Sequence, residues 1–292
     1  MRTQTKLLAP ANRTQSILVF QSPYSRALNI GFIQKKGKKE IFVPGRLNFG
    51  TTRMEHTMHA MTQTLETPFM KKIIKKYKPS QISTVTVIRE ALAYHLPLAL
   101  AQSGVKNYYG DAFVGATHNK KNKTITTDYA YENLEGLTPN GLWIIADSIC
   151  MGRNLHATMT SLLQKFHPKE IVYLCPIASR RGIAYIGALS KKKRIPTSFV
   201  AWGALFGVGE NLYDMPWGHP DTIALDKRDQ ELFIRMYADK LCVGGDFGNC
   251  YFSPTVANNF YDAQLQEHHI TPHVPKVNDV RKIYTSEEIL SR

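Results

Sequence analysis

Short apolar runs alternate with amphipathic stretches along much of this chain. Residues 142–145 (LWII) are too few for a helix and lie between Gly141 and Asp147, so they predict a strand buried on both faces. The apolar residues after the next loop recur at helical spacing: Leu155, Met159, Leu162, Leu163 and Phe166. A phosphate is the natural ligand for such a unit of strand, loop and helix, because backbone N–H groups are free where the helix starts.

From residue 79 onward, strand-like and helical patterns follow one another. This rhythm predicts an α/β fold with a mostly parallel sheet and helices on both faces. The expected strands are 82–88, 108–117, 124–132, 142–146, 171–178 and 197–204. The strands 108–117 and 124–132 are expected at a sheet edge, joined by a polar loop with three lysines. The helix after residue 88 should use Leu92, Leu96 and Leu100 as its apolar face.

Residues 1–78 predict an N-terminal extension that packs on this sheet, with residues 79–292 as the main domain and its C-terminal tail. Strand-like runs at 17–20, 28–33 and 41–43 suit a small hairpin or meander. Residues 53–76 have a helical pattern in which Pro68 should start a new helix or kink one.

Composition limits the classes of protein that this chain fits. With 292 residues, 43% of them hydrophobic and 21% charged, the chain is long enough for one large α/β domain. It has no apolar run of the roughly 20 residues that a membrane span needs and no signal-peptide core, so we expect a cytoplasmic protein without membrane partners. Its four cysteines form no C-x-x-C pair, which favours reduced, mostly buried thiols over disulfides or zinc ligands.

The net charge of +14 is strong enough to require a polyanionic partner or substrate. The lysines are clustered at residues 35–39, 71–76, 120–123 and 191–194. Such clusters attract nucleic acid or a pyrophosphorylated sugar equally, and they also occur as ordinary solvated faces.

The loop at residues 146–154 (ADSICMGRN) carries a family resemblance. It is similar to the phosphoribosyl-pyrophosphate loop of phosphoribosyltransferases, with Asp147 at the second acidic position and Gly152 at the first glycine. Three positions depart from the family pattern, because Ala146 replaces the leading acid, Arg153 the second glycine and Asn154 a phosphate-binding hydroxyl. Taken alone, the loop also fits an ordinary strand-to-helix turn with a solvated Asp.

Three further blocks resemble uracil phosphoribosyltransferases, in the order of that family. Arg89 matches the arginine of the loop that contacts pyrophosphate. The strand 171–178 leads into Gly182 and Ile183, which match, while Arg180 and Arg181 replace a Pro-Glu pair. Residues 240–252 (KLCVGGDFGNCYF) resemble the segment that recognises uracil, with matches at Gly245, Asp246, Gly248 and Phe252 and replacements at Asn249 and Cys250.

The resemblance implies a type I phosphoribosyltransferase fold with a Rossmann-like sheet, and a pentosyltransferase of nucleotide salvage. Such an enzyme transfers phosphoribose from 5-phosphoribosyl 1-pyrophosphate (PRPP) to a nucleobase, here uracil, and requires Mg²⁺. The residues implied in catalysis are Arg89, Asp147 and Asp246, the two carboxylates acting on the metal through water. The residues implied in PRPP binding are Arg89, Asp147, Met151, Gly152, Arg153, Asn154, Arg180 and Arg181, and those implied in base binding are Gly244, Gly245, Asp246, Phe247 and Gly248. The strands 108–117 and 124–132 correspond to a flap over the active site, although an ordinary hairpin explains them as well.

The departures from the family pattern support a second hypothesis. A chain that kept the scaffold but lost catalysis would show replacements at such positions, and its charge of +14 would suit RNA or a ribonucleoprotein. We favour the enzyme, because Arg89, Asp147 and Asp246 are retained, and we expect it to form a homodimer.

Overall fold

A computed structural model describes residues 3–9, 15–36, 38–44, 50–88, 90–121, 124–210, 212 and 215–237. Its centre is an eight-stranded sheet. In spatial order the strands are β1 (Gln4–Ala9), β2 (Gln15–Gln21), β10 (Thr197–Trp202), β9 (Glu170–Cys175), β8 (Leu142–Ala146), β5 (Ile82–Ile88), β6 (Gly110–Lys121) and β7 (Thr124–Asn133). The six inner strands are parallel, while β1 and β7 are antiparallel to their neighbours. The predicted α/β fold with a mostly parallel sheet is confirmed.

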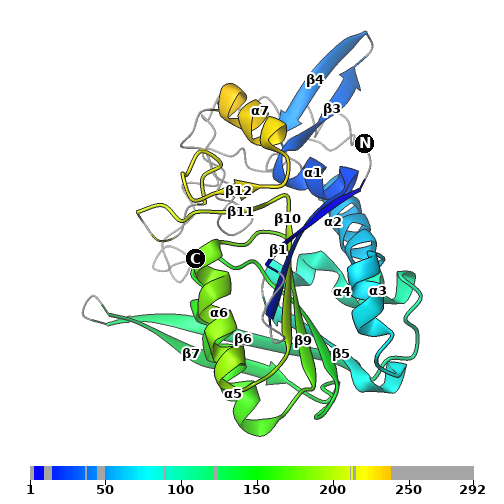
Figure 1. Cartoon of the computed structure of the whole chain (residues 1–292), viewed down its shortest axis with the longest axis vertical. Helices are drawn as coiled ribbons and strands as arrows, with labels where there is room; N and C mark the ends of the chain where they lie inside the picture. Colours follow the sequence, from blue (N-terminus) through cyan, green and yellow to red (C-terminus); the bar gives the residue numbers. More distant parts are fainter. Residues whose placement is uncertain are drawn as a thin grey trace, which may run out of the picture.

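Helices cover both faces of the sheet, so its central strands are buried and mostly apolar. All residues of β8, β9 and β10 are buried. On one face lie α5 (Arg153–Lys165) and α6 (Arg180–Lys192), and on the other lie α1 (Pro23–Asn29), α2 (Gly50–Leu65), α3 (Pro68–Ile74) and α4 (Leu96–Gln102) (Figure 1). The predicted central strand and the helix after it are confirmed, because α5 buries Leu155, Met159, Leu162 and Leu163.

The order of the strands reverses between β5 and β8. From β5 the chain moves outward to β6 and β7, returns to form β8 on the other side of β5, and continues through β9 to β10. In open parallel sheets, ligands bind outside the carboxyl ends of the strands at such a switch point. The carboxyl ends of β5 and β8 are therefore the candidate position for a binding site.

The N-terminal segment contributes two strands to the main sheet. Gln15–Gln21 lies parallel to β10, and Gln4–Ala9 closes that edge. The strand predicted at 28–33 is wrong in its first half, because Ser22 and Ser25 form a capping box that starts α1, with Pro23 at its first turn. Strand β3 (Gly31–Lys36) then pairs with β4 (Lys39–Pro44) as a separate hairpin. The prediction that Pro68 starts a new helix is confirmed.

The helix predicted after β5 is interrupted. A short 3₁₀ helix, η3 (Glu90–Tyr94), is followed by α4, and His95 between them has a left-handed backbone (φ 49°). The break has a steric cause, since Pro97 restricts the residue before it and cannot donate to the preceding turn. Leu92 is consequently 52% exposed, so its predicted place on the apolar face is wrong, whereas Leu96 and Leu100 are buried as predicted.

The predicted hairpin forms, but β6 is an edge strand over only part of its length. From Gly110 to Gly115 β6 pairs with β5, and from Phe113 onward it also pairs with β7. Beyond Gly115 it pairs with β7 alone, after a bulge between Gly115 and Ala116, and the hairpin projects from the body of the sheet (Figure 1). Since β6 is parallel to β5, this projection lies past the carboxyl end of β5.

A small cap lies beyond the end of β10. It contains β11 (Ala204–Leu205), β12 (Ile223–Ala224) and α7 (Lys227–Tyr237). Its core is a second apolar cluster: Ile30, Ile177, Ala204, Phe206, Met215, Trp217 and Phe233. Arg26 of α1 holds α7 in place through Asp229, with Nη2 at 2.8 Å from Oδ1, and Gln21 donates to the same carboxylate. No helix in the described ranges is long and apolar enough to cross a membrane.

Candidate functional site

The loop at residues 147–152 follows β8 at the switch point and is held by backbone hydrogen bonds to the segment after β9. The N–H of Asp147 donates to the carbonyl of Leu174 at 3.2 Å, and the N–H of Ile149 donates to Ile177 at 2.9 Å. In return, the N–H of Ser179 donates to Ile149 at 2.7 Å. The loop is therefore an extension of the β8–β9 ladder, which fixes its path before any ligand binds.

The first turn of α6 packs directly against this loop. The hydroxyl of Ser179 donates to the carbonyl of Cys150 and accepts from the N–H of Gly182 at 2.8 Å. A β-carbon on Gly182 would lie 2.3 Å from the same carbonyl oxygen. Glycine at 182, one of the residues that match the family, is thus required by loop packing, and the N-terminus of α6 is occupied by the protein itself.

The N-terminus of α5 is open by comparison. Its N-cap is Gly152, in the left-handed region at φ 72°, and no side chain caps the helix. The first turn contains no acidic residue and begins with Arg153, which is exposed. Uncapped N–H groups and the positive end of the helix dipole favour an anion here, and without one an arginine at this position is unfavourable.

Asn154, the second residue of α5, is half-buried. Its Oδ1 atom is inside the protein and has no partner among the described residues. The amide hydrogens of the same side chain remain available to a ligand at the helix start. An amide donor would take the place of the hydroxyl that the phosphoribosyltransferase pattern has at this position. Met151, just before the turn, is also half-buried.

Asp147 supplies the negative charge of the loop and is the one carboxylate between residues 142 and 169 of the sequence. It is half-buried at the end of β8. Burial raises the pKa of the neighbouring Cys175 thiol well above its usual value, and the charge of Asp147 raises it further. Cys175 therefore stays protonated, and it is buried as the sequence predicted, whereas Cys150 is half-buried.

Tyr94 joins the segment after β5 to the loop after β8. Its Oη lies 2.5 Å from the Oγ of Ser148, and the Tyr94 side chain is 3% exposed. The two loops at the switch point are thus connected. Sequence reasoning missed this pair, because Tyr94 reads only as an apolar position of a helix and Ser148 only as a loop residue.

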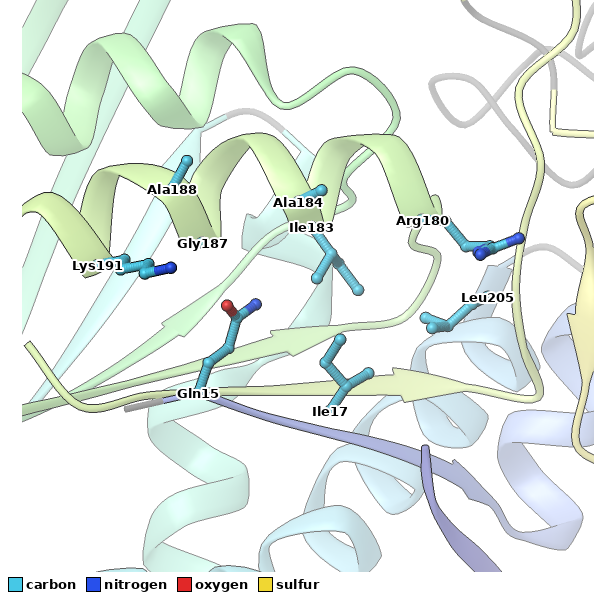
Figure 2. Close-up of a pocket in the computed structure, with 9 residues that line it drawn as sticks. All are labelled: Gln15, Ile17, Arg180, Ile183, Ala184, Gly187, Ala188, Lys191 and Leu205. Atoms are coloured by element: carbon cyan, nitrogen blue, oxygen red, sulfur yellow. The ribbon is translucent and has the colours of Figure 1, made fainter. Parts of the chain in front are cut away.

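The two arginines at the start of α6 are both exposed, and Arg180 is turned away from the loop. Arg180 lies at one end of a groove of about 360 Å³ between α6 and the β2–β10 side of the sheet, with Lys191 at the other end (Figure 2). Gln15 lies between them on the groove floor, and no residue of 147–154 lines the groove. The Nη1 of Arg180 is 3.7 Å from Oδ1 of Asp221, a weak exposed pair.

The remaining predicted site residues lie outside the described residues: Arg89, Gly244, Gly245, Asp246, Phe247 and Gly248. Within the described part of the chain, no three His, Cys, Asp or Glu side chains gather into a metal site. Asp147 by itself fits a Mg²⁺ ion that takes most of its oxygen ligands from water and from the phosphates of a substrate, as this ion usually does.

The fold defines an α/β protein whose loop after β8 lies at a topological switch point and is a candidate anion site. No family model and no curated protein matches the sequence. Among solved structures, the chain is similar to adenine phosphoribosyltransferase from Trypanosoma brucei, with 8% identity, coverage of 68% of this chain and 86% of that chain, and a TM-score of 0.41. It is also similar to adenine phosphoribosyltransferase from Saccharomyces cerevisiae, with 15% identity, coverage of 61% and 97%, and a TM-score of 0.36. A third similar structure is AQ2163 protein from Aquifex aeolicus, with 14% identity, coverage of 56% and 79%, and a TM-score of 0.41.

Proposed function

We propose that this protein is a nucleobase phosphoribosyltransferase that uses PRPP and Mg²⁺. The observation that carries the proposal is the uncapped start of α5 behind Gly152, five residues after Asp147, at the switch point between β5 and β8. A phosphate group and a ribose ring attached to it match these two features, since N–H groups bind the phosphate and a carboxylate accepts from hydroxyls.

In this proposal Asp147 and the start of α5 bind different parts of PRPP. The 5′-phosphate lies against the N–H groups of the first turn of α5, with Arg153 and the Asn154 amide as further donors. Asp147 accepts hydrogen bonds from the ribose hydroxyls, directly or through water on Mg²⁺. Arg89 and Arg181 bind the pyrophosphate, while Arg180 reaches it only by leaving the groove in which it lies.

The reaction is a substitution at C1′ of the ribose. A ring nitrogen of the base attacks C1′, the bond from C1′ to the pyrophosphate oxygen breaks, and pyrophosphate leaves with the electron pair. The base loses its N–H proton, so the products are a nucleoside 5′-monophosphate, pyrophosphate and a proton. Magnesium, when bound, neutralises charge on the pyrophosphate. The protein forms no covalent bond, so positioning and charge placement supply the rate.

The base and the flap complete the proposal. Uracil is the proposed base, on the resemblance of residues 240–252, which lie outside the described residues. The projecting part of the β6–β7 hairpin is proposed to cover the site, because it extends past the carboxyl end of β5. Covering the site would exclude water from the positively charged centre that forms at C1′.

Pyrophosphate release tests this function. The pure protein is incubated with PRPP, Mg²⁺ and each of uracil, adenine, hypoxanthine, guanine and cytosine, and pyrophosphate and nucleotide are both quantified. With uracil we expect pyrophosphate and nucleotide in equal amounts. In a control reaction without any base we expect neither product. Absence of both products with every base would contradict the enzyme.

The second candidate is a protein that still binds PRPP or a nucleotide but has lost catalysis. The residue that favours this candidate is Ala146. This residue stands where the family has its leading acid, and its buried methyl group cannot accept a hydrogen bond from a ribose hydroxyl or from water on a metal ion. A protein of this kind would bind PRPP or a nucleotide without releasing pyrophosphate. The incubation above, combined with a binding measurement, separates the two candidates.

A further inference from the structure

We propose that the amino-terminal edge of the parallel strands, opposite the candidate site, binds single-stranded RNA. This proposal does not depend on the phosphoribosyltransferase function. It rests on a set of cations that are far apart in sequence and that the fold gathers along one edge. We call this set the basic edge: Lys75, Lys76, Lys78, Lys106, Lys165, Lys169, Lys191, Lys192, Lys193 and Arg194.

Backbone contacts place the loops of the basic edge side by side. The N–H of Tyr109 donates to the carbonyl of Pro79 at 3.1 Å, which joins the loops before β6 and β5. The N–H of Lys169 donates to Gly141 at 2.8 Å, and that of Ile171 donates to Pro196 at 2.9 Å. The loops before β8, β9 and β10 are joined in this way. Since neighbouring strands are about 4.8 Å apart, the edge from β10 to β6 is about 20 Å long.

The charge on this edge is largely uncompensated. All ten cations are exposed. Among the described residues, two of them are in ion pairs, Lys76 with Glu170 at 2.9 Å and Lys165 with Glu132 at 2.8 Å. Two further carboxylates lie at this edge, Glu135 in the loop before β8 and Asp111 at the start of β6. A positive field of this extent attracts a polyanion and raises its rate of association.

Helix stabilisation explains only part of this set. Lysines in a last helical turn interact favourably with the helix dipole, which accounts for Lys165, Lys191 and Lys192. Lys78, Lys106 and Lys169 lie in loops, where that explanation does not apply. Arg194 has a left-handed backbone, with φ 56°, at a position after a helix where glycine is the usual residue. An arginine stands there although glycine would suit the backbone better.

The side chains between the cations favour a nucleic-acid strand over a membrane surface. Tyr109 is 48% exposed, three residues from Lys106, and offers a ring on which a base can stack. Of the large apolar side chains that are exposed in the described residues, Tyr109 alone lies in these loops. A surface that inserts into a membrane presents several exposed apolar side chains, and the described loops of this edge provide Tyr109 alone.

Fluorescence anisotropy of the full chain with a labelled single-stranded RNA of 20 nucleotides tests the proposal, at salt concentrations from 50 to 200 mM. About seven phosphate contacts correspond to a slope of about −5 in a plot of log affinity against log salt, so affinity should fall about a thousandfold over this range. The quadruple variant (Lys191→Gln, Lys192→Gln, Lys193→Gln and Arg194→Gln) should make the slope less steep by about 3. The variant Tyr109→Ala should lower affinity about tenfold or more at an unchanged slope.

Lys227→Gln is the matched control, because it removes an exposed cation of the cap, which lies beyond the carboxyl end of β10, and it should leave RNA binding unchanged. Circular dichroism shows whether each variant is folded, and any variant that does not fold is replaced by the corresponding single substitutions. Any of the following would overturn the proposal: no binding at 50 mM salt, wild-type affinity in the quadruple variant, wild-type affinity in Tyr109→Ala, or an equal loss in Lys227→Gln. Tighter binding to vesicles of phosphatidylserine than to RNA would assign the edge to membranes instead. Labelled single-stranded DNA, run in parallel, determines whether the surface distinguishes the two nucleic acids.

Discussion

Asp147 carries the proposed chemistry at the scale of single residues. Asp147→Asn keeps the size of the side chain and removes its charge, so the ribose hydroxyls lose a charge-assisted acceptor worth roughly 1.5–3 kcal/mol. We expect kcat/KM for pyrophosphate release to fall by about tenfold to a hundredfold or more, with little change in melting temperature. Asp221→Asn is the control, because Asp221 is 67% exposed and pairs only weakly with Arg180. Equal activity of Asp147→Asn and the wild type would remove Asp147 from the site.

Gly182 determines how closely α6 approaches the loop. Gly182→Ala would put a β-carbon 2.3 Å from the carbonyl oxygen of Cys150, which is backbone and cannot turn aside. We expect a loss of about 1–3 kcal/mol in the free energy of unfolding and weaker PRPP binding. Chemical denaturation and calorimetry measure the two effects.

Gly187→Ala is the matched control on the same helix. The β-carbon there would meet the end of the Gln15 side chain at 2.5 Å, and that side chain is flexible. A small effect of Gly187→Ala beside a large one of Gly182→Ala supports the packing described here. Equal effects of both would show that any added β-carbon on α6 destabilises the protein.

At the scale of elements, the contact between η3 and the loop after β8 positions the proposed site. Tyr94→Phe removes the hydrogen bond to Ser148, and so does Ser148→Ala. We expect each variant to lose about 1 kcal/mol of stability and to bind PRPP a few-fold more weakly. In the double variant the losses should not add, because both changes remove the same contact. Additive losses would mean that Tyr94 and Ser148 act independently.

The cap depends on one buried contact between elements. Arg26 and Asp229 are 16% and 10% exposed, and Arg26→Ala would leave a carboxylate buried without its cation. We expect a loss of about 3 kcal/mol, with α7 becoming less protected in hydrogen exchange. Arg228→Ala should cost less, about 1 kcal/mol or below, because the Arg228 side chain is 84% exposed although it pairs at 2.9 Å with Asp226, which is 16% exposed. Similar results for the two variants would contradict the role given to Arg26.

For the whole molecule, sequence patterns predicted elements better than the arrangement of those elements. The strand at 142–146 could be predicted because a short run of apolar residues indicates burial on both faces of a sheet. The helix after it could be predicted because its apolar residues recur at helical spacing. The position of Gln15–Gln21 beside β10 could not, because hydrophobic pattern does not specify strand order. The sequence predicted the loop at 147–152, but whether Arg180 faces that loop depends on how α6 is rotated, and the structure turns Arg180 toward the groove. The basic edge likewise appears in the sequence as separate lysine clusters, which only the topology brings together.

Calorimetric titration of the whole protein with PRPP, in the presence and absence of Mg²⁺, tests the central claim that the loop at 147–152 binds a phosphoribosyl group. With Mg²⁺ we expect binding with a Kd between about 1 μM and 1 mM, weaker binding without the metal, and a loss of about tenfold in Arg153→Ala. Arg194→Ala, which removes an exposed arginine at the opposite edge, should bind as the wild type does. No heat of binding at millimolar PRPP with Mg²⁺, or equal affinities for Arg153→Ala and the wild type, would contradict the site proposed here.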